Sequence, residues 1–114
     1  MLIEVLKSKI GHATVTEAEL KYEGSITIDS EVIKVVGIVP GEKVHVLNLN
    51  NGNRFETYTI PGKQGQICLN GPAARLGLVG DQITILSYAL AEQQVAKKFK
   101  MKIVHLDGNN KIKN

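Results

Sequence analysis

The chain has 114 residues, of which 43% are hydrophobic and 22% are charged, and its formal net charge is +3. This length and composition predict one domain that can bury a core, and they argue against a second domain. With no Trp, two Phe and three Tyr, the chain lacks the aromatic side chains of a base-stacking surface, which argues against binding to single-stranded nucleic acid.

The N-terminal residues carry an acid, Glu4, where a signal peptide would carry basic residues, and no apolar run approaches membrane-spanning length. The one cysteine, Cys68, cannot form an intrachain disulfide. Its neighbours Ile67 and Leu69 predict a thiol buried in a strand. We therefore expect a soluble, cytoplasmic protein that does not bind membranes.

Short segments of β-rich sequence, separated by turn residues, predict an all-β fold with one or two short helices. The expected strands are residues 2–6, 13–16, 25–28, 43–49, 54–60, 66–69, 82–89 and 102–106. Residues 50–53 read Asn-Asn-Gly-Asn and predict a hairpin, because Asn-Gly readily adopts the positive φ angles of the favoured turn.

The expected helices are short. Asp29 or Ser30 can cap a helix that Gly37 ends, with apolar residues between them. Residues 89–95 are expected to form another helical turn. Residues 107–114 are polar and expected to be loosely ordered.

Gly24 and Ser25, at the start of the strand expected at residues 25–28, can generate an electrophile from the chain itself. Ser25 Oγ attacks the Gly24 carbonyl and the amide becomes an ester. Elimination and hydrolysis then leave a pyruvoyl group at residue 25. The attack needs a β-hydroxyl, and the bend is easiest at glycine. Gly-Ser is also a common polar turn between strands, so the dipeptide alone leaves both interpretations open.

Six segments match one family in order and approximate spacing, and on them the chain resembles the bacterial pyruvoyl-dependent aspartate decarboxylases. The segments are residues 9–10, 13–16, 22–29, 51–58, 70–74 and 80–81. The resemblance implies a double-psi β-barrel and a homotetramer with active sites between subunits. It also implies a proenzyme cut into residues 1–24 and 25–114. Some relatives need a maturation factor, and the sequence leaves that need open here.

The implied reaction converts L-aspartate to β-alanine and CO2 on the covalent pyruvoyl group, which supplies a precursor of pantothenate and coenzyme A. By resemblance, Arg54 binds the side-chain carboxylate, a role suited to its two parallel donors, and Lys9 assists. Tyr58 corresponds to the proton donor. Thr57 corresponds to a residue that donates to the Gly24 carbonyl oxygen during cleavage.

Tyr22 corresponds to a residue near the substrate, and packing beside the turn is an equal alternative. The loop Asn70-Gly71-Pro72-Ala73 resembles a family loop that lines the pocket with the Asn side chain and backbone amides. Pro72 departs from the family alanine. Because proline has no N–H, donors must come from its neighbours.

Strand alternation places Arg54, Glu56 and Tyr58 on one face and Thr57 on the other, so we expect a site at a subunit interface. In a second departure, Gly11 and then His12 follow Lys9-Ile10, where the family commonly has His at the first position. In a strand this shift turns the imidazole to the opposite face, so His12 is interpreted as a surface residue.

No metal site is expected, because His12, His45 and His105 have no recognised ligand spacing. The alternative to an enzyme is a non-catalytic small β-barrel. It would bind a protein partner or nucleic acid through its rim and its basic C-terminal segment, residues 97–102.

Overall fold

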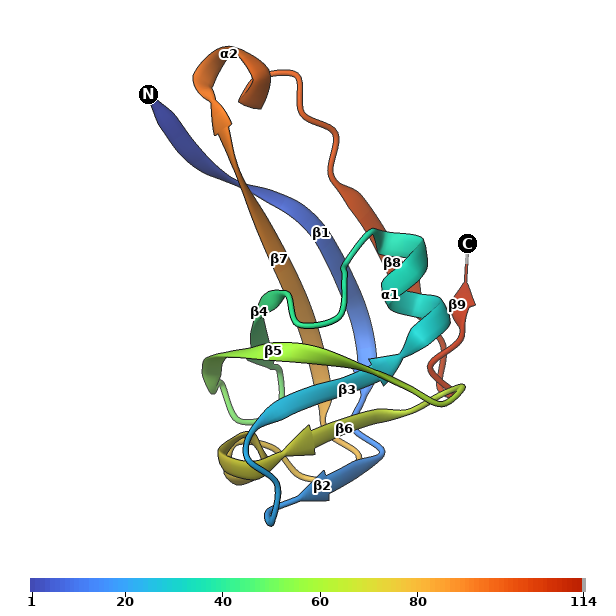
Figure 1. The fold of residues 1–114 in the computed structure, drawn as a ribbon. Helices are drawn as coiled ribbons and strands as arrows, with labels where there is room; N and C mark the ends of the chain where they lie inside the picture. The colour runs from blue at the N-terminus through green and yellow to red at the C-terminus, as the bar shows by residue number, and fades with distance from the viewer. Residues whose placement is uncertain (114) are drawn as a thin grey trace.

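The computed structural model describes residues 1–113, and within them nine strands form one mixed sheet (Figure 1). The strand order is β2-β6-β3-β5-β4-β7-β1-β8-β9. The strands are β1 Leu2–Thr14, β2 Glu17–Glu19, β3 Ser25–Asp29, β4 Lys43–Asn48, β5 Arg54–Gly62, β6 Ile67–Asn70, β7 Gln82–Glu92, β8 Lys102–Leu106 and β9 Ile112–Lys113. The helices are α1 Ser30–Val36, the 3-10 helix η1 Gly71–Arg75 and α2 Gln93–Ala96. The all-β prediction with short helices is confirmed.

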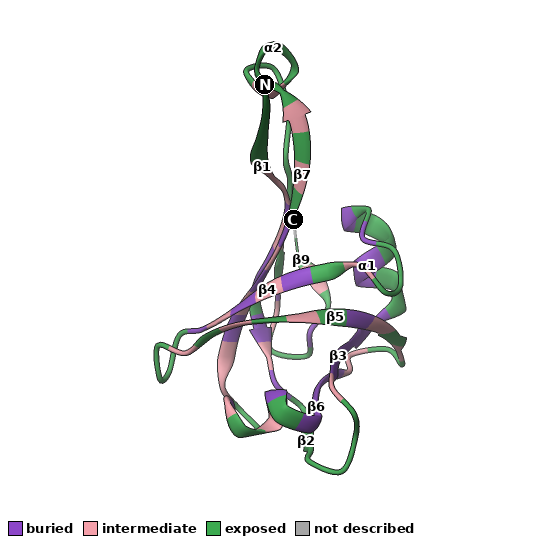
Figure 2. Ribbon diagram, turned by 60° about the vertical axis from the view of Figure 1, so that its left-hand side comes forward, coloured by how far each residue is buried: buried purple, intermediate pink, exposed green. Residues whose placement is uncertain are grey.

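The core lies inside the curved sheet, where alternate residues of the central strands meet. Ile26 and Ile28 of β3 are fully buried, as are Ile83 and Ile85 of β7. Figure 2 shows the buried segments converging on the body of the molecule, with exposed residues toward the strand ends. Because the period of two turns every second side chain inward, these β-branched residues form both the strands and the core.

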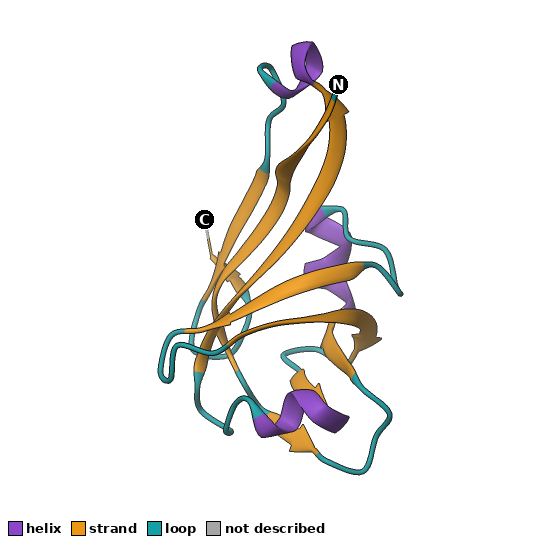
Figure 3. Ribbon diagram, turned by 90° about the vertical axis from the view of Figure 1, so that its left-hand side faces the viewer, coloured by secondary structure: helices purple, strands orange, loops and turns teal. Residues whose placement is uncertain are grey.

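Strands β1 and β7 are longer than the sequence predicted, and they form a ribbon that projects from the barrel (Figure 3). Their antiparallel pairing runs from Leu2 opposite Glu92 to Thr14 opposite Gln82, and β7 is extended where a helical turn was expected at 89–92. Only residues 93–96 form the predicted turn, as α2.

A β-bulge interrupts β1 at the Gly11-His12 departure. The register of β1 with β7 shifts between Ile10 and Ala13. The side chains of Ile10 and Ala13 are both buried, and His12 between them has φ of 60°. His12 is exposed, as predicted, but the bulge rather than simple alternation directs its side chain. The His105 ring occupies the space beside Gly11, because a Cβ there would lie 2.7 Å from His105 Cδ2.

The caps predicted for α1 are confirmed. Asp29 Oδ1 accepts from the Glu31 N–H at 2.9 Å, and Gly37 ends the helix with φ of 78°.

The predicted hairpin is also confirmed, with residues 49–53 joining β4 and β5. Gly52 is the one residue of this connection with positive φ, so the connection is not the two-residue turn that needs positive φ at both central positions.

The prediction of a loosely ordered C-terminal segment is wrong for residues 107–113, and residue 114 lies outside the described range. Asn110 is buried and joins three segments. Its Nδ2 donates to the carbonyls of Thr14 and Gly65 at 2.9 Å, and its Oδ1 accepts from the Thr14 N–H at 2.8 Å. Polarity was misleading here, because one amide satisfies backbone groups from distant parts of the chain.

Two carboxylates should make the fold sensitive to acid. Donation from the Asn48 side chain and then the Leu78 N–H lowers the pKa of Asp81 from its usual 3.8. The N–H groups of Lys111 and Asn109 do the same for Asp107. A lowered folded-state pKa stabilises the fold above the unfolded value, and that contribution is lost as pH falls through the folded value.

We therefore expect the urea midpoint to fall as the pH is lowered below the usual carboxyl pKa of 3.8, with a shallower fall in the double variant Asp81→Asn, Asp107→Asn. The measurement is urea unfolding at a series of pH values. An equally steep fall in the double variant would contradict the assignment.

Candidate active site

Gly24 and Ser25 lie at the entrance to β3, beside a pocket of about 240 Å³. Gly24 has φ of +134°, a conformation that residues with a Cβ rarely adopt. Ser25 is 2% exposed, and its Oγ accepts from Asn70 Nδ2 at 2.8 Å. The backbone is thus bent immediately before a buried, oriented hydroxyl. The pocket is lined by Tyr22, Glu23, Gly24, Ser25, Tyr58 and Ile60.

The antiparallel pairing of β3 with β6 brings the polar groups together. Ser25 lies opposite Asn70, and Thr27 lies opposite Cys68, so these four side chains share one face of the pair. Asn70 Nδ2 also donates to Thr27 Oγ1 at 2.9 Å, and the Cys68 thiol donates to Asn70 Oδ1 at 3.2 Å. Ser25 and Asn70 were predicted as site residues from the sequence, whereas Thr27 and Cys68 were not. The signal for these two was their i, i+2 spacing from the predicted residues.

Gly71 lets residues 22–24 approach the loop after β6. It has φ of +63°, and a Cβ there would lie 2.7 Å from the Gly24 nitrogen and 2.9 Å from the Glu23 carbonyl carbon. Both are backbone atoms, so an added methyl group would have to push the chain at residues 23–24 away from Asn70. Gly71 is therefore the position in the loop where a side chain is least compatible with the geometry at Ser25.

We expect Gly71→Ala to slow the self-cleavage that the sequence predicts at Gly24-Ser25 by about 10²-fold, because a misplacement near 1 Å can cost that much in rate. The measurement is the appearance over time of fragments 1–24 and 25–114 in intact mass spectra. Gly37→Ala is the matched control, since Gly37 also has positive φ but no atom within 4 Å of its added Cβ. Equal cleavage rates in both variants would contradict a role for close approach.

The other loop residues take different places. Pro72 is the second residue of η1 and is exposed, and its Cδ would lie 3.5 Å from a Cβ placed on Gly24. Ala73 is 5% exposed and belongs to the hydrophobic core, so its methyl group does not line the pocket at Ser25. The loop residues closest to Gly24 and Ser25 are therefore Asn70, Gly71 and Pro72.

Strand β5 carries Arg54, Thr57 and Tyr58 with the alternation that the sequence predicted. Arg54 and Tyr58 are exposed, whereas Thr57 is half-buried. Parallel pairing of β3 with β5 sets Ile26 opposite Thr59, which brings Tyr58 to the pocket at Ser25. Neither Arg54 nor Thr57 lines that pocket.

Lys9 lies still farther away in the sheet. It is half-buried on β1, opposite Leu86 of β7, and strands β7, β4 and β5 separate β1 from β3. Within one chain, the structure therefore gathers Tyr22, Tyr58 and the Asn70 loop around Gly24 and Ser25, but it leaves Lys9 and Arg54 elsewhere on the sheet.

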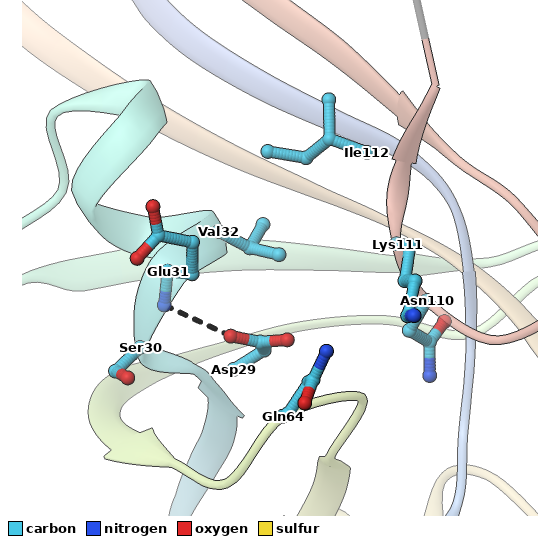
Figure 4. Close-up of a pocket in the computed structure, with 8 residues that line it drawn as sticks. All are labelled: Asp29, Ser30, Glu31, Val32, Gln64, Asn110, Lys111 and Ile112. Carbon is cyan, nitrogen blue, oxygen red and sulfur yellow. Dashed lines mark hydrogen bonds between the residues drawn. The ribbon is translucent and has the colours of Figure 1, made fainter.

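A larger pocket, about 380 Å³, lies between the start of α1 and the segment that precedes β9 (Figure 4). Its buried polar side chains have structural partners. Besides capping α1, Asp29 accepts from the Gly65 N–H at 2.7 Å, and Asn110 makes the bridging bonds described above. Among residues 1–113 no group of three or more His, Cys, Asp or Glu could hold a metal ion, and no helix is long and apolar enough to cross a membrane.

Comparison with known proteins gives one consistent family. A family model described as aspartate decarboxylase matches residues 1–113. Aspartate 1-decarboxylase of Caldicellulosiruptor saccharolyticus is 59% identical over 98% of this chain and 89% of its own length. The protein of the same name from Carboxydothermus hydrogenoformans is 54% identical over 98% and 90%. The one from Campylobacter hominis is 54% identical over 96% of each.

Proposed function

The chain belongs to the aspartate decarboxylase family, and we propose that it makes its own pyruvoyl group at Ser25 to act on L-aspartate. It is a carboxy-lyase that converts L-aspartate to β-alanine and CO2. The observation that carries the proposal is the buried Ser25 hydroxyl, held by Asn70 directly after a glycine with positive φ.

The residues present fit formation of such a group. Ser25 Oγ adds to the Gly24 carbonyl carbon, the C–N bond breaks, and an ester replaces the amide. Loss of the Ser25 α-hydrogen then breaks the Cβ–Oγ bond and frees the Gly24 carboxylate. Addition of water and release of ammonia complete a pyruvoyl cap on residues 25–114, and residues 1–24 form the second chain. Asn70 Nδ2, 2.8 Å from Oγ, can donate to that oxygen as it leaves.

Once formed, the pyruvoyl group supplies a ketone that takes up the amine of aspartate and accepts electrons as CO2 departs. The protein must then return a proton to the α-carbon. Tyr58 lines the pocket at Ser25 and carries a phenolic hydroxyl, so we assign it this role. A positioned general acid is worth roughly 10²- to 10⁴-fold in rate. Tyr22 lines the same pocket and is assigned to the substrate's surroundings.

Arg54 and Lys9 are assigned to the substrate carboxylate across a subunit boundary. Both lie away from Ser25 within one chain, and Arg54 is exposed on the outer face of β5. A homotetramer in which a neighbour presents Arg54 to the pocket would bring an always-charged, two-pronged donor to the carboxylate. Thr57, on the opposite side of β5, is assigned to the self-cleavage step through donation to the Gly24 carbonyl oxygen.

The buried free thiol of Cys68 is in keeping with a reducing compartment, and we propose a cytoplasmic location. The experiment that tests the function also tests whether cleavage needs a maturation factor.

That experiment is intact mass spectrometry of the purified protein under denaturing conditions, followed by measurement of CO2 released from L-aspartate. We expect a fragment ending at Gly24, a partner with a pyruvoyl mass at residue 25, and CO2 release that scales with the fraction cleaved. The proposal would be overturned if the protein stayed uncut after warming and after incubation in an extract of the cells that naturally make it, and if it released no CO2. That result would favour a β-barrel that only binds a partner.

A further inference from the structure

A fully hydrogen-bonded amide lies directly behind the proposed nucleophile. The Asn70 side chain is completely buried, and its Nδ2 donates to Ser25 Oγ at 2.8 Å and to Thr27 Oγ1 at 2.9 Å. Its Oδ1 accepts from the Cys68 thiol at 3.2 Å. The amide nitrogen of Asn70 therefore hydrogen-bonds to side chains of β3, and the amide oxygen hydrogen-bonds to a side chain of β6.

The numbers of donors and acceptors determine which way this amide faces. Its two N–H groups need two acceptors, and only the side with the hydroxyls of Ser25 and Thr27 offers them. The other side presents the single thiol of Cys68 to the amide oxygen. Without that thiol, a buried carbonyl oxygen would lack its partner, and the side chain would have reason to leave its present position.

The thiol is suited to remain a donor. Burial raises the pKa of Cys68 above its usual 9.0, and the nearby carboxylates of Glu17 and Glu19 raise it further. The side chain is 5% exposed, so the proton stays on sulfur at neutral pH. The other acceptor near the sulfur, the Leu69 carbonyl oxygen, is more distant at 3.9 Å. The stronger contact is therefore the one to Asn70.

We propose that Cys68 is a positioning residue for self-cleavage, because its bond to Asn70 Oδ1 keeps Nδ2 directed at Ser25 Oγ. This inference rests on the proposed function. Cys68 does not touch the reacting atoms and acts through Asn70, which does. Orientation matters twice: in holding Oγ beside the Gly24 carbonyl for attack, and in donating to the same oxygen when the Cβ–Oγ bond breaks.

The test compares Cys68→Val, which removes the donor and leaves a slightly larger apolar side chain, with Cys68→Ser, which keeps a hydroxyl donor at the same place. Each chain is made by cell-free synthesis, and the growth of fragments 1–24 and 25–114 is followed by intact mass. We expect Cys68→Val to cleave about 10-fold more slowly than the unaltered chain, the effect of leaving a buried acceptor unpaired. Cys68→Ser should cleave within about 2-fold of the unaltered rate.

Ile67→Val is the matched control, a change of packing volume at the preceding, fully buried position of β6 that removes no side-chain donor. It should lower the urea midpoint without slowing cleavage. Cleavage of Cys68→Val at the unaltered rate would overturn the proposal. So would a Cys68→Ser chain as slow as Cys68→Val, because packing would then explain both. If the unaltered chain itself fails to cleave, the proposed function is what fails, and the assignment of Cys68 falls with it.

Discussion

A Ser25→Ala chain is expected to remain a single uncut polypeptide and to release no CO2 from L-aspartate. The substitution removes the oxygen that attacks the Gly24 carbonyl, so neither the ester nor the pyruvoyl group can form. Because the Ser25 side chain is 2% exposed and its Oγ accepts a hydrogen bond from Asn70, the fold should survive the loss of this one buried hydrogen bond, about 1 kcal/mol.

Intact mass and CO2 release are measured together on this variant. Ser87→Ala is the matched control, because Ser87 is equally buried and hydrogen-bonded, to Ser8, but lies on β7 away from the scissile bond. It should lose a similar amount of stability and still cleave. CO2 release by an uncut Ser25→Ala chain at the unaltered rate would show that the electrophile lies elsewhere.

Arg54→Ala should separate substrate binding from maturation. We expect self-cleavage to proceed, because Arg54 is exposed and does not line the pocket at Gly24 and Ser25. We expect kcat/KM for aspartate to fall by about 10²- to 10³-fold, the usual loss when one partner of a desolvated charge pair is removed. Arg54→Lys should recover part of this, since it restores the charge but not the paired donors. Lys34→Ala, on α1, is the control for loss of a surface cation.

The same variant tests whether sites are shared between chains. Coexpression of Arg54→Ala with Ser25→Ala should restore activity, because some sites then combine the intact Ser25 of one chain with the intact Arg54 of another. With random mixing, about one site in four would be complete. Activity no higher than that of Arg54→Ala alone would place Arg54 and Ser25 of one site in a single chain and refute the shared site.

Local features of the fold followed from the sequence with good agreement. The helix capped by Asp29 and ended by Gly37 was predicted, as were the hairpin around Gly52 and the alternation along β5. These features depend on the φ preferences and hydrogen bonds of a few neighbouring residues, which the sequence states directly. The burial of Cys68 was also predicted, from its apolar neighbours Ile67 and Leu69.

Contacts between distant residues did not follow. The buried amide of Asn110 made a polar segment ordered, and the bulge at His12 replaced a simple strand, because each depends on backbone groups far away in the chain. The length of the β1–β7 ribbon was likewise missed. Pairing over such separations is selected by the topology of the whole sheet, and local propensity gives little indication of it.

For the candidate site, the sequence by itself determined the chemistry: a Gly24-Ser25 bond, an arginine, a tyrosine and an Asn-Gly loop, recognised through motif and family. Only the tertiary structure decided which of these meet. It set Asn70 against Ser25 by pairing β6 with β3, added Thr27 and Cys68 to the same face, and kept Lys9 and Arg54 apart from them. The reason is physical, because residue types limit what a group can do, whereas strand register and sheet order determine what it can reach.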